Sequence, residues 1–211
     1  MDINSNLSSP TGSVLLLSGG IESATLLRLE HRRTQVWPLF VDYGQRAAAR
    51  ERACARAQCS ALDLELKELD MAAVGEGFRA GQSHKLHVPL PHRNLPILSL
   101  ALSYAAQCGA RSLALALNRE DLHAYPSAGE PFLAQFAALA QTLQGCDLRL
   151  PLMHLDKAAI VRLGIELGVD YGQSYSCLLG YERQCGACPQ CEKRRAAFAA
   201  AGVDDPAGYA R

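Results

Sequence analysis

The sequence has no excess of charge of either sign, since 21 Lys and Arg residues balance 21 Asp and Glu residues. A broad basic surface for nucleic acid is therefore not expected. No apolar run approaches the length of about 20 residues that a membrane-spanning helix needs. The first segment, MDINSNLSSPTGS, lacks the basic start and apolar core of a signal peptide. We therefore expect a cytoplasmic protein without membrane association, in which residues 1–12 form a flexible lead-in.

A disulfide framework is not expected, although the chain has eight cysteines. Four of them are scattered through Ala- and Leu-rich segments, where a lone cysteine is usually a small buried apolar residue: Cys54, Cys59, Cys108 and Cys146. The other four crowd into fifteen residues: Cys177, Cys185, Cys188 and Cys191. In a cytosolic chain, such a crowded set is more often a metal site.

Four thiolates are the number that a closed tetrahedral zinc site requires. An iron–sulfur cluster is the alternative, because the spacing C-x2-C-x2-C also begins ferredoxin-like runs. Those runs continue with a fourth cysteine followed by proline, whereas here Lys193-Arg194-Arg195 follow and the fourth thiol lies upstream at Cys177. The spacing favours zinc. With every coordination position filled by a thiolate, the metal would hold the C-terminal segment in place and would not catalyse.

The order of apolar runs predicts alternating strands and helices. Strands are predicted at about residues 13–17, in a run that ends at Asp42, and at 62–69, 112–117 and 147–152. Helices are predicted after Gly20 and at 46–59, 95–107, 131–143 and 156–167, with a long loop at 71–93. This alternation predicts a three-layer α/β domain over residues 13–170, with a parallel sheet covered by helices on both faces. A cysteine-rich segment, 171–211, follows.

The stretch Ser18-Gly19-Gly20 separates the first strand from the first helix. Two glycines allow a sharp turn and the close approach of a ligand to the backbone. The helix that follows would present free N–H groups and its positive dipole end, which suit an anion such as phosphate. Ser23 could cap the helix or touch the anion. The stretch matches neither G-x-x-x-x-G-K-[ST] nor G-x-G-x-x-G, and a plain tight turn is the alternative interpretation.

The run SGGIES closely resembles the SGGxDS pyrophosphate-binding loop of ATP pyrophosphatase enzymes, which cleave ATP between its α and β phosphates. Three further segments are similar to the 7-cyano-7-deazaguanine synthase family: 41–46 (VDYGQR), 91–111 and 151–168. The cysteine-rich tail is the fifth match, so the resemblance extends from about residue 13 to 198. It implies an adenine nucleotide alpha-hydrolase-like fold, a zinc ion on the four cysteines and a homodimer.

In that family a carboxylate on a deazaguanine base is adenylated by ATP, attacked by ammonia to give an amide, and then converted to a nitrile. The resemblance implies catalytic roles for Ser18, Glu22, Ser23 and Arg93. It implies that ATP and Mg²⁺ are bound by Leu17, Ser18, Gly19, Gly20, Ile21, Glu22, Ser23, Asp42, Arg46 and Asn94. It implies that the acid substrate contacts Arg119, Asp121 and Tyr125.

Two departures from the family pattern bear on the substrate. Glu22 replaces the loop aspartate, which keeps the charge but lengthens the side chain. The segment from His123 to Gly129 replaces SGYPDCR and keeps only its Tyr-Pro, so it lacks an acceptor, a thiol and a cation. We therefore expect an enzyme that joins a deazaguanine-type acid to ammonia. The alternatives are a ligase that uses another amine, such as one on a protein, and an inactive nucleotide-binding scaffold.

Overall fold

The computed structural model describes residues 12–79 and 89–210. Five parallel strands form one sheet in the order β3-β2-β1-β4-β5. Their bounds are β1 (Ser13–Leu16), β2 (Val36–Asp42), β3 (Lys67–Asp70), β4 (Ser112–Ala114) and β5 (Asp147–Arg149). The order reverses at β1, so the strand that leads into the Ser-Gly-Gly turn lies at the centre of the sheet. Ligands in such folds bind where the strand order reverses.

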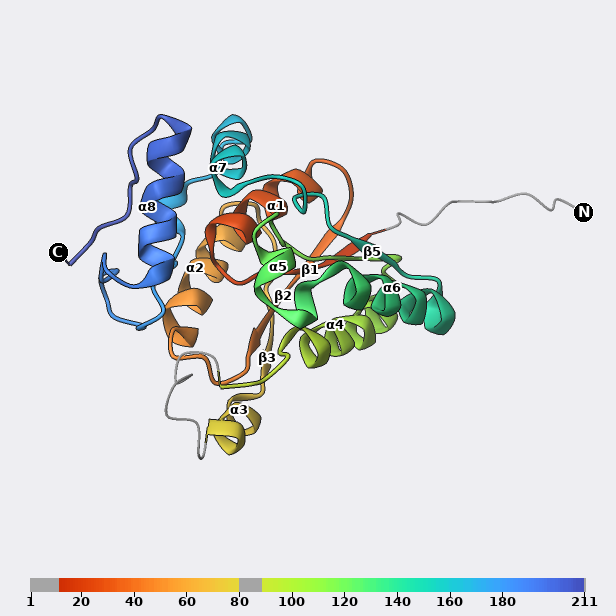
Figure 1. Ribbon diagram of the computed structural model, residues 1–211. Helices are drawn as coiled ribbons and strands as arrows, with labels where there is room; N and C mark the ends of the chain where they lie inside the picture. Colours follow the sequence, from red (N-terminus) through yellow and green to blue (C-terminus); the bar gives the residue numbers. More distant parts are fainter. Residues whose placement is uncertain (1–11, 80–88, 211) are drawn as a thin grey trace, which may run out of the picture.

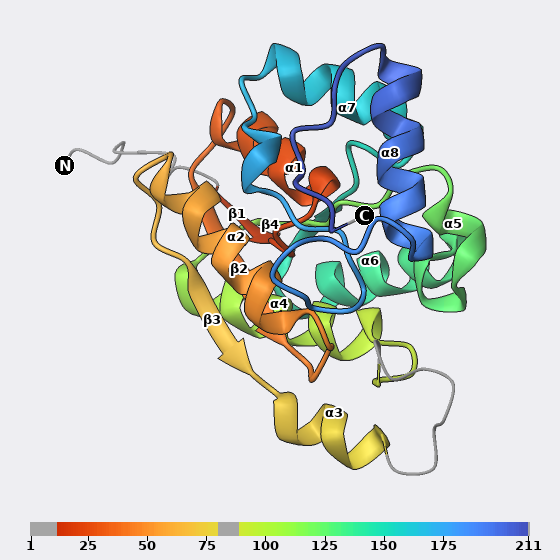
Figure 2. The same cartoon turned by 90° about the vertical axis from the view of Figure 1, so that its left-hand side faces the viewer.

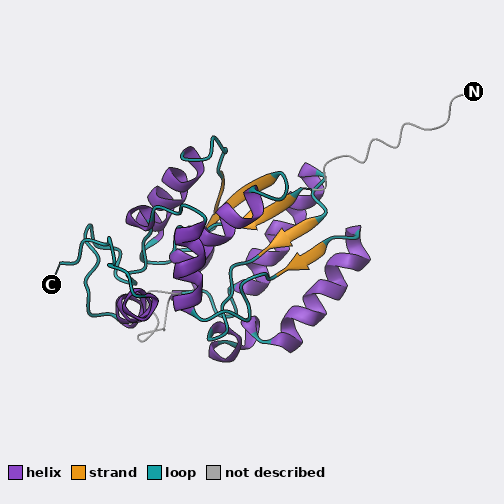
Figure 3. Cartoon of the chain, turned by 90° about the horizontal axis from the view of Figure 1, so that it is seen from above, coloured by secondary structure: helices purple, strands orange, loops and turns teal. Residues whose placement is uncertain are grey.

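Helices cover both faces of the sheet, as Figures 1 and 3 show. One face packs against α1 (Ile21–His31), α2 (Ala48–Ser60), α7 (Lys157–Glu166) and α8 (Pro189–Ala201). The other face packs against α4 (Asn94–Cys108) and α6 (Glu130–Gln144). Alternate residues of β1 serve the two cores, because Leu15 faces the first and Val14 the second, and both are fully buried. The predicted three-layer α/β fold is confirmed.

Several predicted elements differ in part from the structure, and the strands predicted at 112–117 and 147–152 end already at Ala114 and Arg149. The strand predicted at 62–69 begins only at Lys67, because the chain after α2 is still turning and Asp63 adopts a φ of +53°. Part of the predicted loop at 71–93 is a helix, α3 (Ala72–Arg79). Gly75 of α3 lies so close to the Tyr43 carbonyl that a Cβ would come within 1.8 Å of its oxygen. Residues 80–88 of that loop lie outside the described residues.

The shorter elements follow the ends of strands and helices. The segment between β4 and α6 contains the one-turn helix α5 (Asp121–Ala124) and a 3₁₀ helix, η1 (Pro126–Ala128). A second 3₁₀ helix, η2 (Tyr171–Gln173), follows α7. Helix α7, predicted at 156–167, ends just before Gly168, whose φ of +76° is typical of a residue that stops a helix.

The C-terminal segment packs onto the α/β core. In Figure 2, α8 lies beside α7, and the two helices are in direct contact. Ala197 and Phe198 of α8 belong to the same core as Leu15 and Leu17. Tyr171 and Phe198 pack edge to face, with ring centroids 5.4 Å apart. No described helix is long and apolar enough to cross a membrane.

Candidate functional site

A cavity of about 710 Å³ opens at the carboxyl ends of β1, β2 and β4. Its walls come from the residues that follow these strands, from the beginnings of α1 and α4, and from segments 175–179 and 188–193 of the tail. The volume suits a nucleotide or a molecule of similar size. The lining includes most of the residues for which the family resemblance implied a role: Leu17, Ser18, Gly20, Glu22, Ser23, Arg93, Asn94, Asp121 and Tyr125.

The Ser-Gly-Gly turn borders this cavity. Gly19 adopts a φ of +75°, and a Cβ at this position would lie 2.3 Å from the Glu51 carbonyl oxygen. Only glycine readily adopts this positive φ and also has no Cβ to meet the Glu51 carbonyl. Gly20 is the N-cap of α1, and the hydroxyls of Ser18 and Ser23 lie 3.1 Å apart across the turn. The turn therefore presents two hydroxyls and the start of a helix to the cavity, a combination that suits an anion.

Glu22 sits at this end of the cavity in a network of ion pairs and hydrogen bonds. Its Oε1 is 2.7 Å from Lys157 Nζ and accepts a hydrogen bond of 3.0 Å from Asn118 Nδ2. Burial acts to raise the pKa of Glu22, but Lys157 and Asn118 together hold it below its usual value. Burial acts to lower the pKa of Lys157, but Glu22 and Asp121 outweigh it and raise that pKa. Burial raises the pKa of Asp121, and the charge of Glu22 adds to this effect.

The cavity lining also includes aromatic side chains, among them Tyr43 and Tyr125. The Arg93 guanidinium lies over the Tyr125 ring, 5.1 Å from its centroid. Tyr43 and Glu51 also line the cavity, and Gln45 donates a hydrogen bond of 3.0 Å to Glu51. Burial raises the pKa of Glu51 to about 7. The cavity thus combines a turn whose groups suit an anion with side chains that suit a flat, polar ring.

Five of the predicted binding residues do not line the cavity. Gly19 and Ile21 are two of them, although they shape the turn. Asp42 is paired with Arg52 at 2.5 Å, and its other oxygen accepts the Gly44 N–H. Arg46 is exposed. Arg119 is also largely exposed and lies 3.5 Å from Asp156. The binding roles of Asp42, Arg46 and Arg119 stay predictions, and in this structure their side chains engage other groups or solvent.

Sequence reasoning did not single out Lys157, Glu51, Tyr43 or Lys193, all of which line the cavity. Lys157 is the first residue of α7, after an N-cap Asp156 whose side chain accepts the Ala159 N–H at 2.8 Å. That capping signal is readable in the sequence. The approach of Lys157 to Glu22 is not, because it depends on how α7 packs against α1.

The four crowded cysteines form one cluster. Their sulfur atoms all lie within 4.8 Å of one another, and Cys185 Sγ and Cys191 Sγ are 3.9 Å apart. A tetrahedral zinc with bonds of about 2.3 Å holds its sulfurs at roughly 3.8 Å from one another. Backbone N–H groups of Ala187 and Cys188 donate to Cys185 Sγ at 3.4 and 3.2 Å. These donors favour the thiolate form, so the residues fit a tetrahedral thiolate-bound metal such as zinc.

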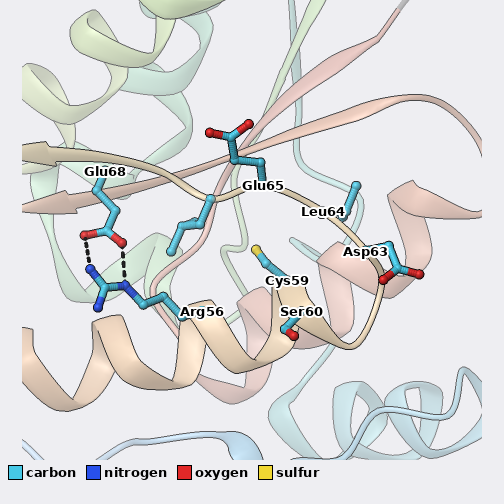
Figure 4. A pocket seen from close by; sticks show the side chains of 8 residues that line it. Arg56, Cys59, Ser60, Asp63, Leu64, Glu65 and Glu68 are labelled. Atoms are coloured by element: carbon cyan, nitrogen blue, oxygen red, sulfur yellow. Dashed lines mark hydrogen bonds and ion pairs between the residues drawn. The ribbon is translucent and has the colours of Figure 1, made fainter.

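The cysteine cluster adjoins the cavity, since Cys188, Pro189 and Gln190 are among the lining residues. A second hollow, of about 570 Å³, lies at the other end of α2 (Figure 4). Arg56 and Glu68 are paired across it, with Arg56 Nε 2.6 Å from Glu68 Oε1. None of the predicted site residues lines it. The chemistry implied by the sequence is therefore concentrated in the cavity at the carboxyl ends of the strands.

The amino-acid sequence matches a known protein family and individual known proteins. The model of the family "Queuosine biosynthesis protein QueC" matches residues 12–202. The 7-cyano-7-deazaguanine synthase of Aromatoleum aromaticum is 35% identical over 96% of this chain and 100% of its own length. The 7-cyano-7-deazaguanine synthase 1 of Sulfurisphaera tokodaii is 32% identical over 93% of this chain and 97% of its own length.

Two solved structures share the fold. NMN synthetase from Francisella tularensis superposes with a TM-score of 0.58 at 19% identity, over 93% of this chain and 79% of the other. The NH3-dependent NAD synthetase from Campylobacter jejuni superposes with a TM-score of 0.55 at 24% identity, over 79% of this chain and 68% of the other.

Proposed function

This chain belongs to the QueC family of queuosine biosynthesis proteins, and on that premise we propose that it uses ATP to adenylate a carboxylic acid and then joins the acid to an amine. The acid is 7-carboxy-7-deazaguanine or a close relative, and the amine is ammonia. A carboxylate oxygen attacks the α-phosphorus and pyrophosphate leaves. The amine then attacks the acyl carbon, loses a proton and displaces AMP to give an amide. A second ATP adenylates the amide oxygen with release of pyrophosphate, and the C–O bond then breaks with loss of AMP and two protons to leave the nitrile.

The observation that carries this proposal is the turn at Ser18-Gly19-Gly20. It opens into the cavity beside the N-terminus of α1, with the Ser18 and Ser23 hydroxyls 3.1 Å apart. Negative charge develops on pyrophosphate as it departs, and preorganised N–H and O–H donors stabilise that charge. Lys157 and Lys193 also line the cavity and add positive charge to it.

We propose that Mg²⁺ binds at the same end of the cavity. Glu22 would hold the ion, since its carboxylate lines the cavity beside the turn and is kept in place by Lys157 and Asn118. When bound, Mg²⁺ would neutralise charge on the phosphates. The longer side chain at position 22 therefore has a partner, Lys157, that fixes where its carboxylate lies.

Measurement of the phosphate product tests the proposal. With ATP, Mg²⁺ and the acid, pyrophosphate and AMP should appear, and Ser23→Ala should suppress them. Ser103→Ala is the matched control, because Ser103 is exposed on α4 and its hydroxyl donates to the Ser99 carbonyl, away from the cavity. Release of orthophosphate and ADP would show that the turn does not bind pyrophosphate as a leaving group.

A second candidate function is favoured by the changed segment at 123–129. An acid site with altered recognition would suit a ligase that stops at the amide and takes an amine other than ammonia, such as one on a protein. The mass of the product distinguishes the two candidates, since a nitrile, a simple amide and a protein conjugate differ in mass.

A further inference from the structure

The carbonyl oxygen of Gly19 accepts two hydrogen bonds. One comes from the backbone N–H of Tyr175 at 3.0 Å, and the other comes from the side-chain amide of Gln58, whose Nε2 lies 3.1 Å away. The two donors belong to segments far apart in the sequence, the tail after η2 and helix α2. Together they fix the direction in which this carbonyl points.

That direction determines where the next N–H points. In a trans peptide the carbonyl of Gly19 and the N–H of Gly20 point in opposite directions, and the described residues contain no cis peptide bond. Gly20 lines the cavity, whereas Gly19 and Gln58 do not. Holding the Gly19 carbonyl toward Gln58 therefore turns the Gly20 N–H to the opposite side. A peptide between two glycines has little steric preference of its own, so external donors must set its orientation.

Gln58 donates to the Gly19 carbonyl although its own amide oxygen has no partner among the described residues. Its residue is only 8% exposed, and its Nε2 also donates to the Gln173 carbonyl at 2.8 Å. Its Oε1 is buried and has no hydrogen-bond partner among the described residues. An unpaired buried amide oxygen is unfavourable, yet rotating the amide would place that oxygen against two carbonyls. The side chain thus acts as a donor that bridges the turn and the tail.

The second donor is held in place by a buried arginine. Arg194 of α8 is fully buried and donates to the Ser174 carbonyl at 3.2 Å and to the Tyr171 carbonyl at 3.0 Å. These bonds fix the backbone just before Tyr175. The same arginine is anchored by Asp205, 2.9 Å from its Nη2. The C-terminal segment therefore supports the turn through the Tyr175 N–H, in addition to the direct hydrogen bond from Gln58.

We infer that Gln58 is a positioning residue: with the Tyr175 N–H, it orients the Gly19–Gly20 peptide so that the Gly20 N–H serves the phosphate end of the cavity. Gln58 acts through the peptide and does not itself touch the ligand. The inference rests on the proposed function only in taking the bound anion to be pyrophosphate, free or as part of ATP.

The test compares Gln58→Met with the wild type. Methionine keeps the length and most of the volume of the side chain but removes both hydrogen bonds. We expect the Kd for inorganic pyrophosphate to rise about tenfold and kcat/KM for ATP to fall by a similar factor, while KM for the acid and the zinc content stay unchanged. Gln141→Met is the matched control, because Gln141 makes a side-chain hydrogen bond to Asp147 on the exposed side of α6, away from the cavity.

Stability measurements separate positioning from folding. If Gln58→Met does not fold, Gln58→Glu is the second variant, since it has nearly the same shape but replaces the donor by an acceptor. Unchanged pyrophosphate affinity in a folded variant overturns the inference, as does failure of the wild type to bind pyrophosphate. Weakened pyrophosphate binding in the variant supports the inference even if the wild type shows no turnover, an outcome that would count against the proposed function alone.

Discussion

Replacing Lys157 by methionine should destabilise the protein by leaving a buried carboxylate without its cation. Lys157 Nζ lies 2.7 Å from Glu22 Oε1, and the two side chains are only 11% and 18% exposed. Methionine fills a similar space without charge. The remaining partner of Glu22 is Asn118, whose amide donates a single hydrogen bond of 3.0 Å.

The expected loss is moderate. Removing one partner of a fully buried ion pair costs about 3–5 kcal/mol. Glu22 keeps one hydrogen bond and borders a cavity, so we expect Lys157→Met to lower the free energy of unfolding by about 2 kcal/mol at pH 7. Glu22→Gln should cost about 1 kcal/mol, because the amide is neutral and Lys157 still faces Asp121. In the double variant the two losses should not add, which gives a coupling energy of about 1.5 kcal/mol.

The dependence on pH gives a second readout. The folded-state pKa of Glu22 lies below the ordinary value of 4.5, so its contribution is present above pH 4.5 and disappears as pH falls through the folded-state value. The pKa of Lys157 lies above 10.5, so its contribution is lost only as pH rises through that higher value. Without Lys157, burial should raise the pKa of Glu22. The deficit of Lys157→Met should therefore shrink as pH falls from 7 to 5.

Urea unfolding of the wild type, the two single variants and the double variant at pH 5 and pH 7, followed by far-ultraviolet circular dichroism, measures both effects. A loss in the double variant equal to the sum of the single losses would show that the two residues do not interact in solution. A deficit of Lys157→Met that is independent of pH would contradict the assignment of that deficit to an ionised Glu22.

Two further predictions concern the metal and the turn. Purified protein should contain about one zinc per chain and show no visible iron–sulfur absorption. Cys188→Ser should lower the melting temperature more than Cys54→Ser. Brown protein with acid-labile sulfide would refute the assignment of zinc. Gly19→Ala should cost more than the roughly 1–2 kcal/mol of positive φ alone, because its Cβ would meet the Glu51 carbonyl, and it should abolish pyrophosphate release. Gly109→Ala is the control, since its φ is +71° with open space around it; equal losses would contradict the argument.

Local patterns in the sequence predict most of the helices. The start of α1 and the ends of α6 and α7 follow from apolar periodicity and from glycines that stop a helix, such as Gly145 and Gly168. Helix α3 is missed because Gly75 and Gly77 lower its intrinsic propensity. Gly75 is used instead for close packing against the Tyr43 carbonyl, a tertiary contact that no local pattern reveals.

The residues of the candidate site likewise divide into those that local sequence patterns reveal and those that only the tertiary structure brings together. The Ser18-Gly19-Gly20 turn is a local motif, so the order of residues along the chain is enough to identify it. Lys157 and Glu51 face the cavity only because α7 and α2 pack against the same side of the sheet. The sequence contains both side chains but no information on their distance from Ser18. Residues contributed by distant elements are therefore the part of a site that sequence reasoning misses.

Because segment 123–129 departs from the family pattern, the affinity for the acid substrate is the most informative property to predict and test. Where family members have an aspartate, this chain has Ser127, whose side chain is buried and whose carbonyl accepts a hydrogen bond of 2.9 Å from Asn94. The neighbouring Ala128 is 1% exposed and offers no polar side-chain group. This loop therefore presents neither a carboxylate nor a thiol to a bound base.

Unpaired polar groups on a buried base cost about 1–3 kcal/mol each, so the loss of two partners should weaken binding of 7-carboxy-7-deazaguanine by about two orders of magnitude. Glu51, which lines the cavity from α2, is a carboxylate that could restore part of that recognition. The assay incubates the protein with this acid, ATP and ammonium and follows the products by mass. Efficient conversion to the nitrile at ordinary substrate levels would refute the reasoning, and it would mean that Glu51 or another cavity residue reads the base in place of the lost loop. Accumulation of the adenylate or the amide, or no reaction until another amine is added, would support it.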